Sequence, residues 1–319
     1  MKNKKILLTG VSGLLGSWLA ESLLLSDCDI TGLSLNKNLD FLISSKKIIN
    51  DIEKHYFDIS DEEKLKSIFN KDYDLVIHLA AQTQVRDALR NPIHTFKSNI
   101  QGTWNILELC RLNELPIVVA SSDKAYGESK TLPYQENFSL NGEYPYEVSK
   151  STTDLLCKTY RTTYNLNVAT LRCGNIYGGG DLNWDRLIPG VVKWLINNET
   201  PVLRTNGTFK RDWVYVEDVT QAYIGVGSAL LNNQINVSDS YNFSSTDYLS
   251  VMDIYKKIVL KFSDEYIEPI IKEDSKYEIK DQYLSSKKIE KELNVIPKFN
   301  IDSGLDKTIN WYKKHLAEI

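Results

Sequence analysis

The sequence predicts an α/β protein built on a doubly wound parallel sheet, with a smaller lobe formed by the C-terminal part of the chain. Over the first two thirds of the chain, short apolar segments alternate with segments of helical periodicity. Strands that alternate with helices favour a parallel sheet covered on both faces. A glycine-rich turn also joins the first apolar segment to the first helical one. The length of 319 residues is sufficient for one such unit and a smaller lobe.

The apolar segments are short enough to be buried strands, and the segments between them have the spacing of amphipathic helices. The predicted strands are Lys5 to Leu8, Asp29 to Leu35, Leu75 to Leu79, Ile117 to Ala120 and Asn167 to Arg172. The predicted helices are Gly16 to Leu25, Glu62 to Phe69, Pro92 to Leu112 and Tyr146 to Tyr164. Beyond residue 175 the pattern becomes irregular, which indicates the smaller lobe.

Composition and charge indicate a globular protein with a small partner. The chain is 42% hydrophobic, and its 38 basic and 42 acidic side chains give a formal net charge of -4 without a long run of one sign. This balance suggests neither nucleic acid nor an anionic membrane as a partner. The N-terminal MKNKK leads directly into the first strand, which is too short for a signal peptide or a membrane span. We therefore expect a cytoplasmic protein.

The four cysteines, Cys28, Cys110, Cys157 and Cys173, show no CxxC spacing and have few histidines near them. This spacing argues against a zinc site and against a disulfide scaffold. We expect reduced, partly buried thiols and no metal.

The turn after the first strand has the pattern GxxGxxG, with glycines at Gly10, Gly13 and Gly16. Glycines at these places let the backbone approach a pyrophosphate, and the N-terminus of the following helix offers free N–H groups and a favourable dipole. The turn therefore predicts a dinucleotide site of the Rossmann type, with Leu14 and Leu15 in the first turn of the helix.

The second strand ends in GLSLNK at residues 32–37, without the acidic residue that binds the ribose 2′-hydroxyl of NAD. The choice between NAD and NADP is open on this evidence. Asp58 and Ile59 lie between the second and third predicted strands, after a further apolar stretch, and are placed to meet the adenine edge, although a plain strand-end Asp without a cofactor role is the alternative.

Polar residues follow the fourth predicted strand. Ser122, Asp123 and Lys124 come at its end, and Tyr146 and Lys150 stand four residues apart in a predicted helix. Residues at this spacing share one helix face, so the ammonium is expected to lower the pKa of the phenol and make it a usable base.

Seven motifs in this order resemble those of an extended short-chain dehydrogenase/reductase. They are TGVSGLLG at 9–16, HLAAQ at 78–82, SNIQGT at 98–103, SSDKAYG at 121–127, YEVSK at 146–150, LRCGNIYGGGD at 171–181 and RDWVYVED at 211–218. Over essentially its whole length the chain is similar to the NAD-dependent epimerase/dehydratase family, and most of all to CDP-glucose type 4,6-dehydratases. The resemblance implies a Rossmann-type domain over residues 1–175, which carries the catalytic residues, and a sugar-nucleotide-binding lobe over 176–319, with some segments returning to the first domain.

The resemblance also implies roles for the polar residues. Tyr146 is the base for the sugar hydroxyl, Lys150 holds the nicotinamide ribose, and Ser122 hydrogen-bonds the reacting hydroxyl. A 4,6-dehydratase, a lyase, needs in addition an acid and a base near C5 and C6. Asp123 would protonate the C6 oxygen, and Lys124 would assist at C5.

The implied binding residues fall into two groups. Those for NAD are Gly10, Gly13, Leu14, Leu15, Gly16, Ser34, Asp58, Ile59, Leu79, Ala80, Ala81, Asn99, Tyr146 and Lys150. Those for the nucleotide sugar are Gln82, Arg86, Asn175, Arg186, Leu187, Arg204, Arg211 and Asn242. Asn99 is expected to brace the segment that carries Tyr146. A homodimer is expected through a four-helix bundle, for which Ile100, Trp104, Leu107 and Leu155 suit either the seam or the core.

Three alternatives stay open. Ala125-Tyr126-Gly127 departs from the CDP-type pattern, so UDP, GDP and dTDP sugars compete with CDP sugars as substrates. A 4-epimerase would need everything above except Asp123 and Lys124. A non-catalytic dinucleotide-binding protein on the same fold is the more distant alternative.

Overall fold

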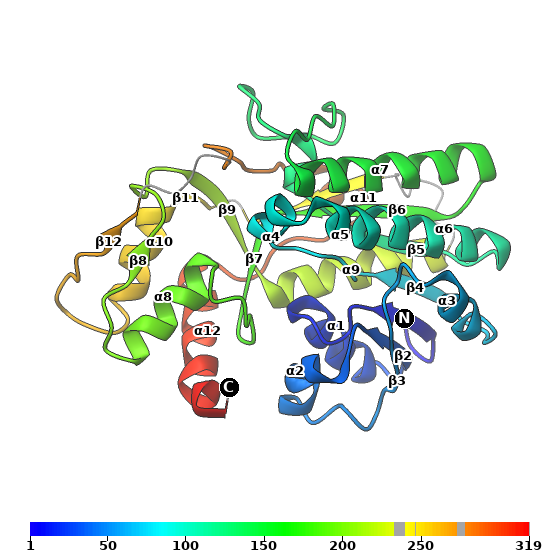
Figure 1. Ribbon diagram of the computed structural model, residues 1–319, viewed down its shortest axis with the longest axis horizontal. Coiled ribbons are helices and arrows are strands. Elements are labelled where there is room, and N and C mark those ends of the chain that lie inside the picture. Colours follow the sequence, from blue (N-terminus) through cyan, green and yellow to red (C-terminus); the bar gives the residue numbers. More distant parts are fainter. Residues whose placement is uncertain (233–239, 246, 273–277, 319) are drawn as a thin grey trace.

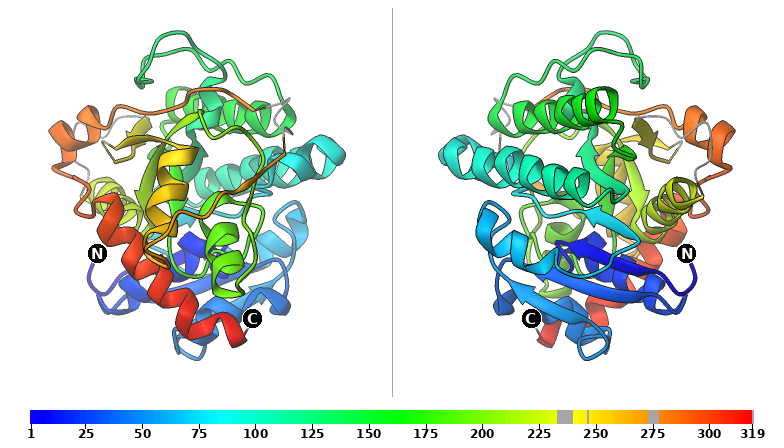
Figure 2. Two further views of the ribbon diagram at one scale, coloured as in Figure 1. Left: turned by 90° about the vertical axis from the view of Figure 1, so that its left-hand side faces the viewer. Right: turned by 90° about the vertical axis from the view of Figure 1, so that its right-hand side faces the viewer.

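The computed structural model describes residues 1–319 apart from 233–239, 246, 273–277 and 319. Figure 1 shows a parallel sheet covered by helices, with a smaller lobe beside it that contains α8, α10 and α12. Figure 2 shows the same arrangement from the two sides, with α6 and α7 running next to each other along one face. None of the helices within the described residues is long and apolar enough to span a bilayer.

The large sheet has seven parallel strands in the order β10-β6-β5-β4-β1-β2-β3. Their bounds are β1 Lys5–Thr9, β2 Asp29–Ser34, β3 Glu53–Tyr56, β4 Leu75–His78, β5 Ile117–Ser122, β6 Val168–Cys173 and β10 Ser240–Phe243. The strand order reverses direction between β1 and β4, and ligands of doubly wound sheets bind in the crevice outside the carboxyl ends of the strands at such a point. The predicted fold class is therefore confirmed.

Helices cover both faces of this sheet. They are α1 Leu14–Leu24, α2 Phe41–Ser45, α3 Glu62–Ile68, α4 Val85–Arg90, α5 Pro92–Phe96, α6 Gly102–Leu112, α7 Pro145–Tyr164, α9 Val216–Leu231 and α11 Lys287–Leu293. Short 3₁₀ turns occupy η1 Lys37–Leu39, η3 Asp123–Tyr126 and η4 Leu316–Glu318.

Alternate residues of each strand face opposite cores, as the pleat of a strand requires. In β1, Ile6 and Leu8 belong to the core that α1 and α9 cover. Leu7 belongs to the core under α3, α6 and α7. Because both faces are buried, most of the central strands are apolar throughout, which is why the sequence predicted them.

The smaller lobe has a core of its own, built around Val191, Ile258 and Leu305. Its elements are β7 Asn175–Tyr177, α8 Leu187–Ile196, β8 Val202–Leu203, β9 Lys210–Tyr215, β11 Tyr248–Ser250, α10 Val251–Val259, β12 Ile270–Ile271 and α12 Ile301–His315. They form a three-stranded sheet, β11-β9-β7, and a two-stranded sheet, β12-β8. The chain crosses back between these elements, so that α9 packs on α1 and β10 joins the edge of the large sheet.

Two elements of the large unit differ from the sequence prediction. β3 has the sequence EKHY, which is not apolar, because it lies at the edge of the sheet and is only partly buried. The helix predicted from Pro92 to Leu112 is interrupted by a π-helical turn at Lys97–Gln101. This widened turn carries Asn99, which is buried with 1% of its surface exposed.

Candidate active site

The glycine turn between β1 and α1 forms a close backbone cradle. Gly10 has φ +73°, and a Cβ there would lie 2.9 Å from the backbone N of Ala80. A Cβ on Gly16 would lie 2.1 Å from the carbonyl oxygen of Gly10. No side chain caps the N-terminus of α1, and its first turn, with Leu14 and Leu15, holds no acidic residue. The free N–H groups and the close approach fit the pyrophosphate of a dinucleotide.

Sequence reasoning missed an acidic residue beside this turn. The Asp40 side chain is buried and accepts hydrogen bonds from Ser12 Oγ, at 2.8 Å, and from the Tyr56 hydroxyl. It lies six residues beyond Ser34, the last residue of β2, so a search of the strand end alone does not find it. A carboxylate next to the phosphate turn disfavours the additional phosphate of NADP.

The residues expected at the adenine contact their own chain in this structure. Asp58 Oδ1 accepts the backbone N–H of Ser60 at 2.8 Å. Ile59 is buried beneath Gly102, where a Cβ would lie 2.4 Å from Ile59 Cδ1. Both residues lie in the segment between β3 and α3.

The end of β5 presents Ser122 and Asp123 in a buried 3₁₀ turn. Ser122 Oγ accepts the backbone N–H of Lys124 at 3.2 Å and donates to Asp123 Oδ1 at 2.8 Å. The Ser122 hydroxyl also forms a hydrogen bond with the Tyr146 hydroxyl. The structure therefore brings the predicted Ser, Asp and Tyr together at one strand end.

The pKa of Tyr146 differs from the sequence prediction. This pKa is raised to about 12, mainly by burial and also by the charge of Asp123, although Arg186 and the Ser122 hydrogen bond act to lower it. Lys150 does not contribute, because its ammonium donates to the carbonyl oxygen of Ala120 at 2.9 Å. The prediction that Lys150 lowers the phenol pKa is wrong for this structure. Burial instead lowers the pKa of Lys150 itself to about 8.

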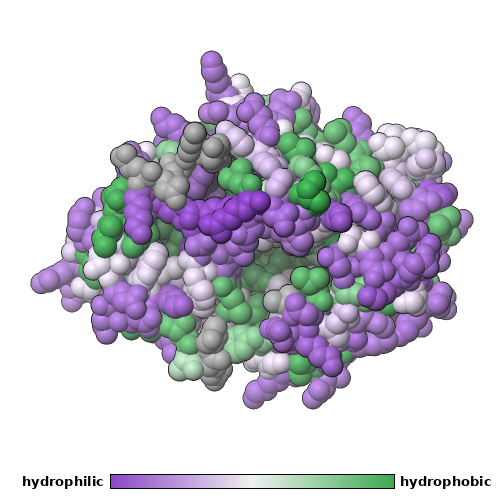
Figure 3. Space-filling model, in the orientation of Figure 1, coloured by the Kyte–Doolittle hydropathy of each residue, from purple (hydrophilic) through white to green (hydrophobic). Residues whose placement is uncertain are grey.

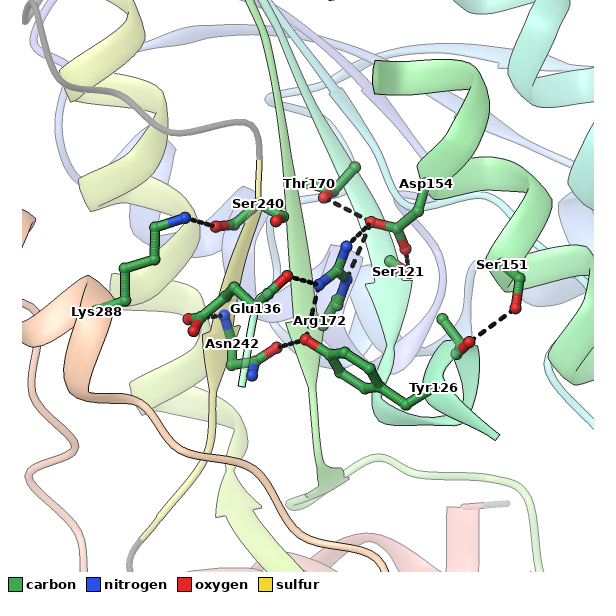
Figure 4. Close-up of polar contacts among 11 residues, drawn as sticks. Ser121, Tyr126, Glu136, Ser151, Asp154, Thr170, Arg172, Ser240, Asn242 and Lys288 are labelled. Carbon is green, nitrogen blue, oxygen red and sulfur yellow. Dashed lines mark hydrogen bonds and ion pairs between the residues drawn. The ribbon is translucent and has the colours of Figure 1, made fainter. Parts of the chain in front are cut away.

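Helix α7 is fixed to the sheet by a buried polar cluster around Asp154, shown in Figure 4. Asp154 Oδ1 accepts from Thr170 Oγ1 at 2.8 Å and from Arg172 Nε and Nη2 at 3.0 and 2.8 Å. Ser121 Oγ donates to the other Asp154 oxygen. Because Ser121 precedes Ser122 and Lys150 lies one turn before Asp154, this cluster sets the distance between the strand end and the helix.

Asn99 links α7 to the segment after β4. Its Nδ2 donates to Ser149 Oγ at 3.0 Å, and Ser149 Oγ donates to the carbonyl oxygen of Tyr146 at 2.7 Å. Its Oδ1 accepts the backbone N–H of Gln82 at 2.7 Å. The backbone N–H groups of Leu79 and Ala80 each donate to Thr9 Oγ1 at 3.2 Å. Ala81, Gln82 and Arg86 continue this segment and are partly exposed.

A second carboxyl and an amide reach the strand end from the smaller lobe, and sequence reasoning did not assign them. Asp212, in β9, is fully buried and acts on Asp123 electrostatically. Gln282, also fully buried, accepts from Lys124 Nζ at 2.9 Å through its Oε1. Asp212 stands next to Arg211 in the RDWVYVED motif, so a signal for it was present; nothing in the sequence around Gln282 marked it.

Two arginines of the smaller lobe, Arg186 and Arg204, are paired with carboxylates. Arg186 caps α8 next to Leu187, forms an ion pair with Asp181 at 3.0 Å, and is close enough to Tyr146 to lower its pKa. Arg204 pairs with Asp185 at 2.7 Å. Asn175 begins β7, and its Nδ2 donates to the carbonyl oxygen of Asp212 at 3.4 Å. Arg186, which was expected among the residues that bind the nucleotide sugar, therefore lies close to the candidate catalytic Tyr146.

Two expected substrate residues point into the protein. Arg211 is buried and donates to the backbone carbonyls of Lys210, Ile279 and Lys280. Asn242 has no exposed surface; its Oδ1 accepts from the Tyr126 hydroxyl at 2.7 Å and its Nδ2 donates to the carbonyl of Tyr134 at 3.1 Å. The expected substrate contact of Asn242 does not fit this placement, because the strand β10 turns its amide into the interior.

The face shown in Figure 3 is hollowed near its middle. A separate cavity of about 1250 Å³ borders the Asp154 cluster, with Glu136, Lys158 and Lys288 among its lining residues. Neither the glycine turn nor Ser122, Tyr146 and Lys150 line it. The candidate active site therefore lies elsewhere, at the carboxyl ends of β1, β4 and β5.

Comparison with known proteins places this geometry in context. Residues 6–238 match the NAD dependent epimerase/dehydratase family. A CDP-glucose 4,6-dehydratase of Salmonella typhimurium is 29% identical over 98% of this chain and 91% of its own length. A UDP-glucuronate 4-epimerase of Thermodesulfobacterium geofontis is also 29% identical, over 98% of this chain and 97% of its own. The crystal structure of a dTDP-glucose 4,6-dehydratase of Bacillus anthracis in complex with NAD has a TM-score of 0.84 at 25% identity, covering 98% of this chain and 97% of that one.

Proposed function

The chain belongs to the NAD-dependent epimerase/dehydratase family, and from that premise we propose that it is a nucleotide-sugar 4,6-dehydratase. It would convert an NDP-hexose, with CDP-glucose favoured, to the NDP-4-keto-6-deoxyhexose. The observation that carries this proposal is the buried carboxyl of Asp123, with Lys124 after it, beside Ser122 and Tyr146. Epimerisation at C4 requires no such acid.

The first task of the site is oxidation at C4. The glycine turn would hold NAD, which would supply the acceptor for the C4 hydride and the donor for its return. Tyr146 takes the proton of the C4 hydroxyl, and Ser122, bonded to the Tyr146 hydroxyl, orients that hydroxyl. Because burial holds the pKa of Tyr146 at about 12, nearby positive charge has to assist its ionisation, and Arg186 is the charged residue that lowers this pKa, together with the Ser122 hydrogen bond.

The second task is removal of water across C5 and C6. The departing C6 oxygen needs a proton, which the buried Asp123 supplies. Lys124 assists at C5, and its bond to Gln282 Oε1 holds the ammonium on the lobe side of the strand end. Loss of water and addition of the hydride to C6 would complete the reaction, so that one turnover involves no net oxidation or reduction of the cofactor.

CDP-glucose is favoured because the curated CDP-glucose 4,6-dehydratase is similar over almost the whole chain. The SDK sequence at 122–124, GGGD at 178–181 and DRLIP at 185–189 resemble that type of enzyme. Arg186 and Leu187 lie in the last of these segments, at the start of α8. The nucleotide is tested by incubation with CDP-, UDP-, GDP- and dTDP-glucose, and CDP-glucose is expected to give the highest kcat/KM.

The 4-epimerase is the second candidate, because an epimerase relative is as similar to this chain as the dehydratase relative. The two are separated by the mass of the product, since dehydration removes one water and epimerisation removes none. With Asp123→Asn, a dehydratase is expected to lose about 10²-fold or more of its water-losing activity. A conversion without mass change that Asp123→Asn leaves intact would establish the epimerase instead.

We also propose that the protein forms a homodimer through α6 and α7. Trp104 and Leu155 are 44% and 53% exposed on these helices, whereas Leu107 is fully buried in the intramolecular core. Sedimentation of the wild type is expected to give a dimer, and the double variant Trp104→Ser/Leu155→Ser a monomer. A monomeric wild type would contradict the proposal.

A further inference from the structure

Two buried carboxyl groups meet where the smaller lobe contacts the end of β5. Asp123 has 3% of its surface exposed and Asp212 has none. Within the described residues, four buried side-chain atoms have no hydrogen-bond partner: Asp123 Oδ2, Asp212 Oδ1, Ser244 Oγ and Gln282 Nε2. The Ser244 hydroxyl lies close enough to Asp212 to lower its pKa. The other oxygen of each group is bonded, to Ser122 Oγ at 2.8 Å in Asp123 and to the backbone N–H of Leu284 at 2.8 Å in Asp212. A buried acceptor without a donor is costly, so this pair needs a physical explanation.

The strand register brings the Asp212 carboxyl to the strand end that carries Asp123. Ser122 pairs with Cys173 in the parallel ladder of β5 and β6, so the residues that follow, Asp123 and Gly174, leave neighbouring strands together. Adjacent strands lie about 4.8 Å apart. A Cβ on Gly174 would lie 2.0 Å from Asp212 Oδ1, so this oxygen rests directly on the Gly174 backbone. Glycine at 174 is therefore what admits the second carboxyl beside the first.

The charges around the pair do not allow two ionised carboxylates without a penalty. The pKa of Asp212 is raised to about 7, mainly by burial and then by the charge of Asp123. The charged and titratable groups that face one or both carboxyls are Arg211, Cys173, Tyr134, Tyr146 and Tyr248. Arg211 is the cation that faces both carboxyls, while the ammonium of Lys124, the residue after Asp123, donates to Gln282. One facing cation balances one negative charge rather than two.

A single proton removes both problems. An ionised carboxylate only accepts hydrogen bonds, so two carboxylates leave two acceptors facing each other. With one proton between them, one oxygen becomes a donor to the other and the pair carries one charge. We propose that Asp123 and Asp212 share one proton, and that Asp212 is a positioning residue which keeps Asp123 protonated until the C6 oxygen departs.

This proposal rests on the proposed dehydration and extends it. As the C6–O bond breaks, Asp123 Oδ2 gives its proton to the leaving oxygen. The amine of Lys124 takes the proton from C5 and returns it to C5 when hydride reaches C6. Tyr146 has meanwhile gained the proton of the C4 hydroxyl. At the end of the turnover Tyr146 holds one proton more and Asp123 one fewer, and exchange with solvent resets both groups. When the shared proton has left, the charge of Asp212 favours the uptake of a new proton by the pair.

The first experiment needs no substrate. Infrared difference spectra of the NAD-loaded protein are recorded over pH, and the wild type is expected to show a protonated carboxyl band that disappears as the pH rises through about 7. In Asp212→Asn the band is expected to be absent at pH 6, because the second carboxyl that shares the proton has been removed. A wild type without this band at pH 6, or a titration that Asp212→Asn leaves unmoved, would overturn the proposal.

The second experiment follows water loss by product mass. Asp212→Asn is expected to move the alkaline limb of the pH profile for dehydration down by about one pH unit, which lowers the dehydration rate about ten-fold above neutral pH. Hydride removal from C4, measured in a single turnover, is expected to keep its pH dependence. Asp218→Asn is the matched control, since Asp218 is also buried but bonds the backbone N–H groups of Lys298 and Phe299, and it is expected to leave the limb in place. If no sugar nucleotide loses water with the wild type, the proposed dehydration fails while the infrared titration still decides the pair.

Discussion

Replacement of Asp154 by Asn tests whether the polar cluster behind β5 holds the catalytic helix in place. The Asp154 and Arg172 side chains are only 2% and 6% exposed and lie 2.8 Å apart. Removal of one charge from a buried pair leaves the other without compensation, which costs about 3–5 kcal/mol. Since a typical domain is stable by about 5–15 kcal/mol, the variant is expected to lose a large part of its stability.

The free energy of unfolding is measured in urea for the wild type, for Asp154→Asn and for Glu108→Gln. The ion pair of Glu108 and Arg111, 2.6 Å apart, is the matched control, because these two side chains are 41% and 33% exposed. Exposed pairs contribute about 1 kcal/mol or less, so the control is expected to stay close to the wild type. Equal, small losses in both variants would refute the reasoning.

Three further results are expected. Gly16→Ala should abolish NAD binding, measured by calorimetry, because its Cβ would lie 2.1 Å from the Gly10 carbonyl oxygen. Gly13→Ala should weaken binding less, because its Cβ would lie 3.3 Å from the same oxygen, and equal affinity in both variants would contradict the proposed role of the glycine turn. The kcat/KM of the wild type should fall as the pH rises through about 8, where buried Lys150 loses its proton, and Lys150→Arg should remove this limb; an unchanged limb would assign it to another group. Burial lowers the pKa of His78 from 6.5 to about 3, so below pH 6.5 the unfolded chain binds a proton that the folded chain excludes. The free energy of unfolding should therefore fall between pH 6.5 and pH 3. A flat profile, or the same fall in His78→Gln, would contradict this.

The parts of the site that the sequence predicted depend on neighbours close along the chain. The Gly10–Gly16 turn follows directly from its own spacing. Ser122 at a strand end, and Tyr146 and Lys150 on one helix face, likewise need only local periodicity. The same holds for the five predicted strands of the large sheet, β1, β2, β4, β5 and β6, whose burial on both faces makes them largely apolar.

The parts that were missed depend on packing between distant segments. Asp40 reaches the glycine turn through an irregular segment, and Asp212 and Gln282 reach Ser122 and Asp123 only because the smaller lobe folds against the sheet. The error for the Tyr146 pKa has the same origin. A spacing of four residues places Lys150 on the right face, but burial and the Ala120 carbonyl decide where its ammonium points.

The most direct test of the proposed dehydration uses CDP-glucose that carries deuterium at C4. The account predicts a product that is lighter by one water and carries the deuterium at C6, because the hydride removed from C4 is returned there within one turnover. A product of unchanged mass with the label still at C4 would contradict the account and identify a 4-epimerase.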